Sequence, residues 1–229
     1  MLREGARPRD VRAAGRAKSP AGACDLLFFE RSAREAGAAR IAGLDEAGRG
    51  PLAGPVVAAA VVFPEGLLIS GVTDSKQVAE GRRELLYDVI IAASVAYGIG
   101  IVDERTIDEI NILEASIIAM ERALEGITPP PDHLLIDGNF TLPHVSIPQR
   151  PIVKGDCLSH SIAAASILAK VARDRLMREL HKRYPQYNFQ KHKGYGTKEH
   201  MDLIRQYGPC DAHRKSFQPV AGMLQEQPR

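Results

Sequence analysis

Paired cysteines, long apolar runs and an excess of one charge are all missing from this sequence. The three cysteines (Cys24, Cys157 and Cys210) lie far apart, with no Cys-x-x-Cys pair. We therefore expect neither a disulfide framework nor a zinc site of paired cysteines. We expect a reducing, cytoplasmic location. The longest apolar run, Pro55 to Phe63, has the length of a strand and is too short for a membrane span. The formal net charge is only +2, so overall charge does not indicate a nucleic-acid partner.

The 229 residues are enough to bury a sizeable core, and their composition divides them into one domain and two ends. Residues 1–24 are basic, rich in Ala, Gly and Pro, and lack the apolar segment of a secretory signal. We expect these residues to form a disordered arm. Residues 25–220 are expected to form a single domain that includes C-terminal helices, and 221–229 a tail.

The middle of the chain alternates short apolar runs, which predict strands, with amphipathic stretches, which predict helices. This α/β pattern predicts a mixed sheet with helices on its faces, in which a short link makes the first two strands antiparallel. The predicted strands span 40–45, 55–63, 94–102, 133–137 and 151–153. The predicted helices span 26–36, 75–90, 107–124, 159–184 and 198–207; Asp74 or Ser75 caps the second, and Ile110, Leu113, Ile117 and Met120 form the buried face of the third.

Four acids stand where apolar strands end or a helix begins. In IAGLDEAGRGPLAG (41–54) two acids follow an apolar run, a third follows LLI, and a fourth lies between the fifth strand and the long helix. Each acid alone fits a turn or a cap. Together, like charges at one sheet edge repel unless a cation binds between them, and Mg²⁺ or Mn²⁺ prefers such oxygen ligands. We therefore expect two divalent ions, an arrangement suited to phosphodiester hydrolysis, at Asp45, Glu46, Asp137 and Asp156.

The glycines after the first two acids allow a second interpretation. Gly48, Gly50 and Gly54 could form a dinucleotide-binding turn, but a β-branched strand follows them instead of the helix that would hold a pyrophosphate. They also fit a plain tight turn, or a loop that lets another backbone approach closely. No rival nucleophile motif, such as Gly-x-Ser-x-Gly or His-Glu-x-x-His, is present.

Seven blocks then follow a recognisable order: DEAGRGPLAGPVVAAAVV (45–62), TDSK (73–76), LIDGN (135–139), VKGD (153–156), SIAAASILAKVARD (161–174), HKGYGTKEH (192–200) and HRKSFQPV (213–220). Together they resemble the bacterial ribonuclease HII family. The resemblance implies a ribonuclease H-like fold: a five-stranded mixed sheet flanked by helices, with a helical C-terminal part. It implies an endonuclease that cleaves the RNA strand of RNA–DNA hybrids and removes primers and embedded ribonucleotides. Incision would fall 5′ of a single ribonucleotide and leave 3′-hydroxyl and 5′-phosphate ends.

The resemblance also implies roles for individual residues. The four family acids match Asp45, Glu46, Asp137 and Asp156, and the first is expected to bridge two metal ions. The family's Gly-Arg-Gly triplet matches Gly48, Arg49 and Gly50, which would hold the side of the ribonucleotide that carries the 2′-hydroxyl. The family tyrosine at the RNA–DNA junction matches Tyr195.

The expected partners are RNA–DNA hybrids and ribonucleotide-containing duplex DNA. Basic residues cluster after position 150, although each lysine alone also fits a solvated surface charge. The expected duplex contacts are Lys76, Lys154, Lys170 and Arg173, followed by Lys191, Lys193, Lys198, Arg214 and Lys215. His160 and His192 are expected to be surface or capping residues. A monomer is expected, with no membrane partner and no recognised clamp-binding motif, because no aromatic pair follows Gln225.

Two other hypotheses share this fold or these residues. A DNA resolvase- or transposase-like nuclease would need the acids, but it would not need a sensor for a 2′-hydroxyl, so Tyr195 and the Gly-Arg-Gly triplet argue against it. A non-catalytic hybrid-binding module would not need the acids, and all four are present.

Overall fold

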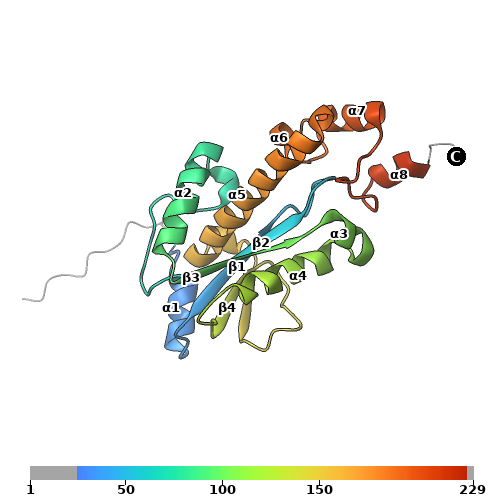
Figure 1. The fold of residues 1–229 in the computed structure, drawn as a ribbon. Coiled ribbons are helices and arrows are strands. Elements are labelled where there is room, and N and C mark those ends of the chain that lie inside the picture. Colours follow the sequence, from blue (N-terminus) through green and yellow to red (C-terminus); the bar gives the residue numbers. More distant parts are fainter. Residues whose placement is uncertain (1–24, 226–229) are drawn as a thin grey trace, which may run out of the picture.

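The computed structural model describes residues 25–225, which form a five-stranded mixed sheet with helices on both faces (Figure 1). The strand order is β3-β2-β1-β4-β5; β1 is antiparallel to β2 and parallel to β4. The predicted fold class and the predicted antiparallel pair are confirmed. The predicted arm at 1–24 and the end of the predicted tail at 226–229 lie outside the described residues.

The elements follow one another as the alternation predicted. The strands are β1 (Ile41–Ala47), β2 (Val56–Val62), β3 (Ala96–Val102), β4 (His133–Asp137) and β5 (Gln149–Ile152). The helices are α1 (Phe28–Glu35), α2 (Glu80–Ala93), α3 (Glu104–Ile110), α4 (Ile112–Glu125), α5 (His160–Arg183), α6 (Phe189–His192), α7 (Lys198–Tyr207) and α8 (Val220–Gln225). Three 3₁₀ turns are η1 (Ser75–Gln77), η2 (Gly155–Cys157) and η3 (Pro185–Tyr187). Within residues 25–225, no helix combines the length and the apolar character needed to cross a membrane.

The central strand β2 is buried along its whole length, and its side chains alternate between two cores. Val56, Ala58 and Ala60 face the core beneath α4, whereas Ala59 and Val61 face the core beneath α5. This alternation is the two-residue period of a strand covered on both faces. The sheet therefore packs between α4 and α5. Because both of its faces are covered, a functional site is expected at the ends of the strands.

Helix α5 crosses β1 at very close range. A Cβ on Gly43 would lie 2.2 Å from the backbone carbon of Ser161, so only glycine fits beneath the first turn of α5. Ser159 caps this helix by accepting a hydrogen bond from the N–H of Ile162. The close contact brings the start of α5, and the acid that precedes it, next to the sheet.

The predicted helix over 107–124 is wrong in one respect, because it is two helices. Asn111 adopts a left-handed conformation (φ 74°) between α3 and α4, and its side chain accepts hydrogen bonds from the first N–H groups of α4. The apolar repeat runs through this break and so conceals it. Leu113, predicted to face the core, is 41% exposed, whereas Ile117 and Met120 are buried as expected.

Two further differences concern helix ends. Asp74 caps the 3₁₀ turn η1 by accepting from the N–H of Lys76, and the following helix α2 begins only at Glu80. At the other end, α8 begins with buried Val220 and continues into the segment predicted as a tail. Leu52 and Ile204 pack with Val220, so the C-terminal helices cover the loop that follows β1.

Candidate active site

Three of the four predicted acids meet at one edge of the sheet. Leu44 of β1 pairs with Ile136 of β4, so the next residues, Asp45 and Asp137, reach the ends of neighbouring parallel strands at the same level. The N–H of Gly155 donates to the Asp137 carboxylate at 2.6 Å, which places Asp156 beside it. The pairing of β1 with β4 stops at Leu44, just before the two acids, whereas its pairing with β2 continues to Ala47.

The carboxylates sit in surroundings that disfavour their charge. Burial raises the pKa of Asp45 well above its usual range, and the nearby charges of Glu46 and Asp137 add to the shift. Burial likewise raises the pKa of Glu46 and of Asp137; the neighbouring charge of Asp156 contributes to the latter. Oε2 of Glu46 is buried without a hydrogen-bond partner. Buried, mutually repelling oxygens of this kind fit a divalent cation, which would offset both burial and repulsion.

A second group of possible metal ligands lies next to these acids. In the described part of the chain, ligand atoms of Asp74, Asp156 and Cys157 all lie within 4.8 Å of one another, whereas no three of the predicted acids come so close. Burial raises the pKa of the Cys157 thiol, so this residue is a weak candidate for a ligand at neutral pH. The acids at the strand ends are therefore the better candidates for metal ligands.

The loop after β1 is held by two buried arginines. Gly48 has φ +101°, and a Cβ there would lie 2.1 Å from Nε of Arg173, so a larger residue does not fit. Arg214 donates to the carbonyl oxygens of Gly48 (2.6 Å), Arg49 (2.9 Å) and Gly54 (3.0 Å). Arg173 donates to the carbonyls of Ala53 (3.1 Å), Pro55 (2.9 Å) and Lys193 (3.0 Å).

The prediction that Arg173 and Arg214 contact the duplex is therefore wrong. Both side chains are 0% exposed. Their guanidinium nitrogens are used on backbone carbonyls, and a buried group of this kind cannot reach a phosphate on the surface. Burial lowers the pKa of Arg173 to about 10 and of Arg214 to about 9, which leaves both charged at neutral pH. They fix the backbone of the loop after β1, residues 48–54, which we call the glycine loop.

Arg173→Met is expected to destabilise the fold. The substitution leaves three buried carbonyls without donors, so the free energy of unfolding should fall by roughly 3 kcal/mol or more. Arg178→Met is the matched control on the same helix; its ion pairs with Glu80 and Glu84 are partly exposed, and the expected loss is below about 1 kcal/mol. Chemical denaturation measures both. Unchanged stability together with weaker duplex binding would contradict the structural role and indicate that Arg173 contacts the duplex.

The glycine loop and two of the acids line one cleft. Its lining residues are Asp45, Glu46, Ala47, Gly48, Arg49, Gly50, Ser75, Lys76, Ser166, Lys170 and Tyr195. Tyr195 is 44% exposed, and its ring edge lies 4.0 Å from the point where a Cβ on Gly50 would stand. Arg49 forms an ion pair with Glu46 at 3.4 Å. The cleft thus places an aromatic ring and a bare backbone beside the carboxylates.

Three of the predicted lysine contacts, those nearest the acids in the sequence motifs, lie in different settings. Lys76 is 80% exposed, with Nζ 3.6 Å from Asp156, and Lys170 lines the cleft while its Nζ donates to Asp174 at 2.5 Å. Lys154 is exposed and lies two residues before Asp156, outside the cleft lining. Lys76 and Lys170 therefore line the same cleft as Asp45 and Glu46, and Lys154 does not.

A cluster of buried histidines stands behind Tyr195, and the sequence did not reveal it. Nδ1 of His200 donates to the carbonyl of Tyr195 (2.9 Å), and the Nε2 atoms of His200 and His213 are 3.1 Å apart. His192 stacks on His200 and is itself buried, so of the two predicted settings, surface or capping, the surface one is wrong; its Nδ1 accepts a hydrogen bond from the N–H of Gly194. His160 is buried too, where it accepts a hydrogen bond from a backbone N–H. The cluster fixes the loop that carries Tyr195.

The histidine cluster predicts acid-dependent stability. Burial lowers the pKa of His200 and of His213 to about 4, from the usual 6.5. As the pH falls below 6.5, the unfolded chain protonates both rings while the folded protein keeps them neutral, so the free energy of unfolding should fall steadily between pH 6.5 and 4. Denaturation at several pH values measures this slope. His200→Gln should flatten it and exposed His144→Gln should not; equal slopes in all three proteins would contradict the assignment.

Comparison with known proteins gives matches over most of the chain. The family model described as Ribonuclease HII matches residues 42–220. A Ribonuclease HII from Caldanaerobacter subterraneus subsp. tengcongensis is 54% identical over 193 residues, covering 84% of this chain and 80% of the relative. One from Geotalea uraniireducens is 55% identical and covers 85% and 90%. The crystal structure of ribonuclease H2 from Pyrococcus horikoshii superposes with a TM-score of 0.69 at 27% identity, covering 82% and 98%.

Proposed function

This chain belongs to the ribonuclease HII family, whose activity is the cleavage of RNA in RNA–DNA hybrids, and we propose that it also incises duplex DNA on the 5′ side of single ribonucleotides. One observation carries the proposal: the lining of a single cleft includes the acids Asp45 and Glu46, the triplet 48–50 and Tyr195. A centre for phosphodiester hydrolysis and a surface able to touch a sugar thus stand side by side.

The acids supply the hydrolytic part. Asp45, which lies between Glu46 and Asp137 and is repelled by both, would hold two divalent ions together with these neighbours and Asp156. When bound, such ions would supply activation of the attacking water and charge stabilisation at the leaving oxygen. Asp45 itself is oriented by the N–H of Glu46, which donates to it at 2.7 Å. The bond broken is on the 5′ side of the ribonucleotide, leaving a 3′-hydroxyl and a 5′-phosphate.

The glycine loop and Tyr195 supply the recognition. A 2′-hydroxyl is the group that distinguishes RNA from DNA at one position. Gly48 and Gly50 let a strand approach their backbone, and the exposed ring of Tyr195 offers a face for the ribose beside them. Arg49, Lys76 and Lys170 would bind the neighbouring phosphates. These features argue against a resolvase-like nuclease, which has no need to read a 2′-hydroxyl.

A panel of three labelled duplexes tests the proposed substrate. All-DNA duplex, DNA with one ribonucleotide and RNA–DNA hybrid are incubated with the protein and Mg²⁺ or Mn²⁺. We expect cleavage of the hybrid and one nick in the second duplex, with all-DNA untouched. Cleavage of all three duplexes would favour the resolvase-like alternative, and binding without cleavage would indicate a hybrid-binding module.

A further inference from the structure

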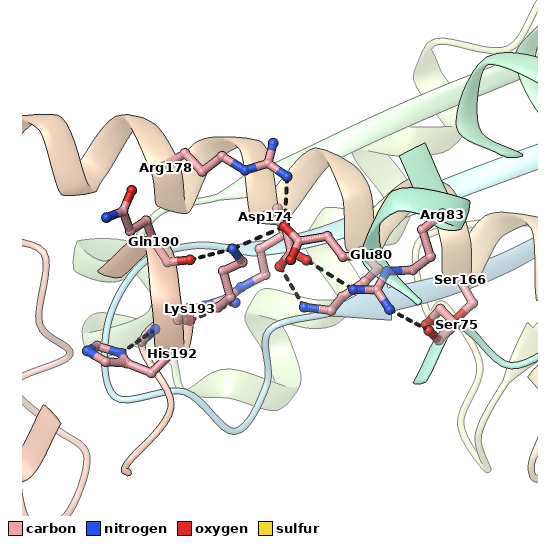
Figure 2. A network of polar contacts seen from close by, with 12 residues as sticks. Ser75, Glu80, Arg83, Ser166, Asp174, Arg178, Gln190, His192 and Lys193 are labelled. Carbon is pink, nitrogen blue, oxygen red and sulfur yellow. Dashed lines mark hydrogen bonds and ion pairs between the residues drawn. The ribbon is translucent and has the colours of Figure 1, made fainter. Parts of the chain in front are cut away.

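Asp174 is a buried carboxylate shared by two cations behind the cleft. It lies on α5 and is 2% exposed. One oxygen accepts from Nζ of Lys170 at 2.5 Å. The other lies 3.6 Å from Nη2 of Arg83, which comes from α2 (Figure 2). Lys170 lines the cleft, whereas Asp174 does not. Asp174 is therefore placed to act on the cleft only through its partners.

Arg83 extends the network to the second cleft lysine. Its Nη1 donates to the carbonyl oxygens of Ser75 (3.0 Å) and Val78, at the two ends of the turn η1. Ser75 also accepts a hydrogen bond from Ser166 of α5 at 2.8 Å. Lys76, whose Nζ faces Asp156, is the next residue in this turn. The turn that carries Lys76 is thus joined to α5 directly, through Ser75 and Ser166 (Figure 2), and indirectly, through Arg83 and Asp174.

The charges of the network point in the same direction. One carboxylate faces two cations, so the group keeps a net positive charge beside a cleft that would receive phosphates. Burial lowers the pKa of Lys170, and its hydrogen bond with Asp174 acts in the opposite direction and favours the charged lysine. Without the carboxylate, Lys170 and Arg83 would repel each other at close range.

We propose that Asp174 is a positioning residue for phosphodiester cleavage: it holds Lys170 directly, and the Lys76 turn through Arg83, in the places where they bind phosphates of the substrate. The inference rests on the proposed function of the cleft. Asp174 itself touches no substrate. Because a small displacement of a positioning group reduces the rate more than the affinity, kcat is the quantity it should control.

A general tether between α2 and α5 is the competing explanation, and Glu84 provides the matched control. Glu84 on α2 pairs with Arg175 (2.6 Å) and Arg178 (2.8 Å) of α5, and none of the three lines the cleft. Glu84→Gln therefore weakens the same helix contact without touching the lysines. If Asp174 only joined the two helices, both substitutions would have the same effect on cleavage.

The test compares single-turnover cleavage of the one-ribonucleotide duplex with its binding in Ca²⁺. Asp174→Asn should lower the cleavage rate about tenfold or more while the Kd changes less than about threefold; Glu84→Gln should change neither. In a Lys170→Met background, Asp174→Asn should lower the rate further by less than about threefold, since its main partner is already gone. Equal rates in wild type and Asp174→Asn, or independent losses in the double variant, would overturn the inference.

Two further results need their own interpretation: an Asp174→Asn variant that does not fold, and a wild-type protein without activity. If Asp174→Asn does not fold by circular dichroism, Arg83→Met takes its place: a rate about tenfold lower with unchanged affinity supports the network, and an unchanged rate overturns it. If the wild-type protein itself does not nick the one-ribonucleotide duplex, the proposed function fails. A wild-type protein that nicks beside an equally active Asp174→Asn variant removes the positioning role alone.

Discussion

Asp45→Asn is expected to lower the cleavage rate by about a thousandfold or more, the size of loss seen when a central member of a catalytic group is removed. The amide keeps the shape of the side chain but removes the charge that would hold both metal ions. Because burial and two neighbouring carboxylates raise the pKa of Asp45, the neutral amide should not destabilise the fold. We expect the thermal midpoint in EDTA to equal or exceed that of the wild type. Cleavage and thermal unfolding are measured on the same preparations.

Asp202→Asn is the control for this prediction, since Asp202 pairs with Arg205 on the exposed side of α7 and does not line the cleft. It should cleave at the wild-type rate. Mn²⁺ should raise the thermal midpoint of the wild type and of Asp202→Asn, and raise that of Asp45→Asn less, because ion binding to the folded state adds stability. Wild-type cleavage by Asp45→Asn would remove the metal-binding role of this residue.

Tyr195→Ala is expected to lower incision at a single ribonucleotide by about tenfold to a hundredfold, with a change in Kd below about threefold. The edge of the ring lies beside Gly50 at the cleft, where it would align one ribose, whereas affinity for a duplex comes mainly from many phosphate contacts. Rates are measured under single-turnover conditions, and binding in Ca²⁺.

Tyr207→Ala provides the comparison for Tyr195→Ala. Tyr207 is also exposed, but it ends α7 and does not line the cleft, so its removal should leave incision unchanged. Equal losses of rate and affinity after Tyr195→Ala would make Tyr195 an ordinary affinity residue. A loss on RNA–DNA hybrid as large as that on the one-ribonucleotide duplex would argue against a role at the RNA–DNA junction.

The acids could be predicted from the sequence because their positions depend on local pattern and strand direction. Asp45 and Asp137 each close an apolar run, and a parallel pairing of those runs brings the two ends together. The break at Asn111 could not be predicted, since the apolar repeat continues through it and one left-handed residue changes no period. The apolar repeat of a helix can be recognised in a sequence, whereas the φ angle of a single residue such as Asn111 cannot.

The buried arginines and histidines depend on contacts between distant parts of the chain. Arg214 reaches carbonyls in the loop after β1, more than a hundred residues earlier, and so leaves the surface that its charge suggests. His200 and His213 join two blocks whose spacing resembles no metal motif. Asp174 looks like a helix-surface acid until α2 brings Arg83 against it. For such residues, burial follows from tertiary packing.

The position and chemistry of the cut test the central claim most directly. A labelled duplex with one ribonucleotide is incubated with Mg²⁺, Mn²⁺ or EDTA, and the ends of the products are mapped. The account predicts a single cut on the 5′ side of the ribonucleotide, ending in a 3′-hydroxyl, with either metal and none in EDTA. A cut in EDTA that leaves a 2′,3′-cyclic phosphate would show that the ribose attacks its own phosphate, and it would contradict the role given to the four acids.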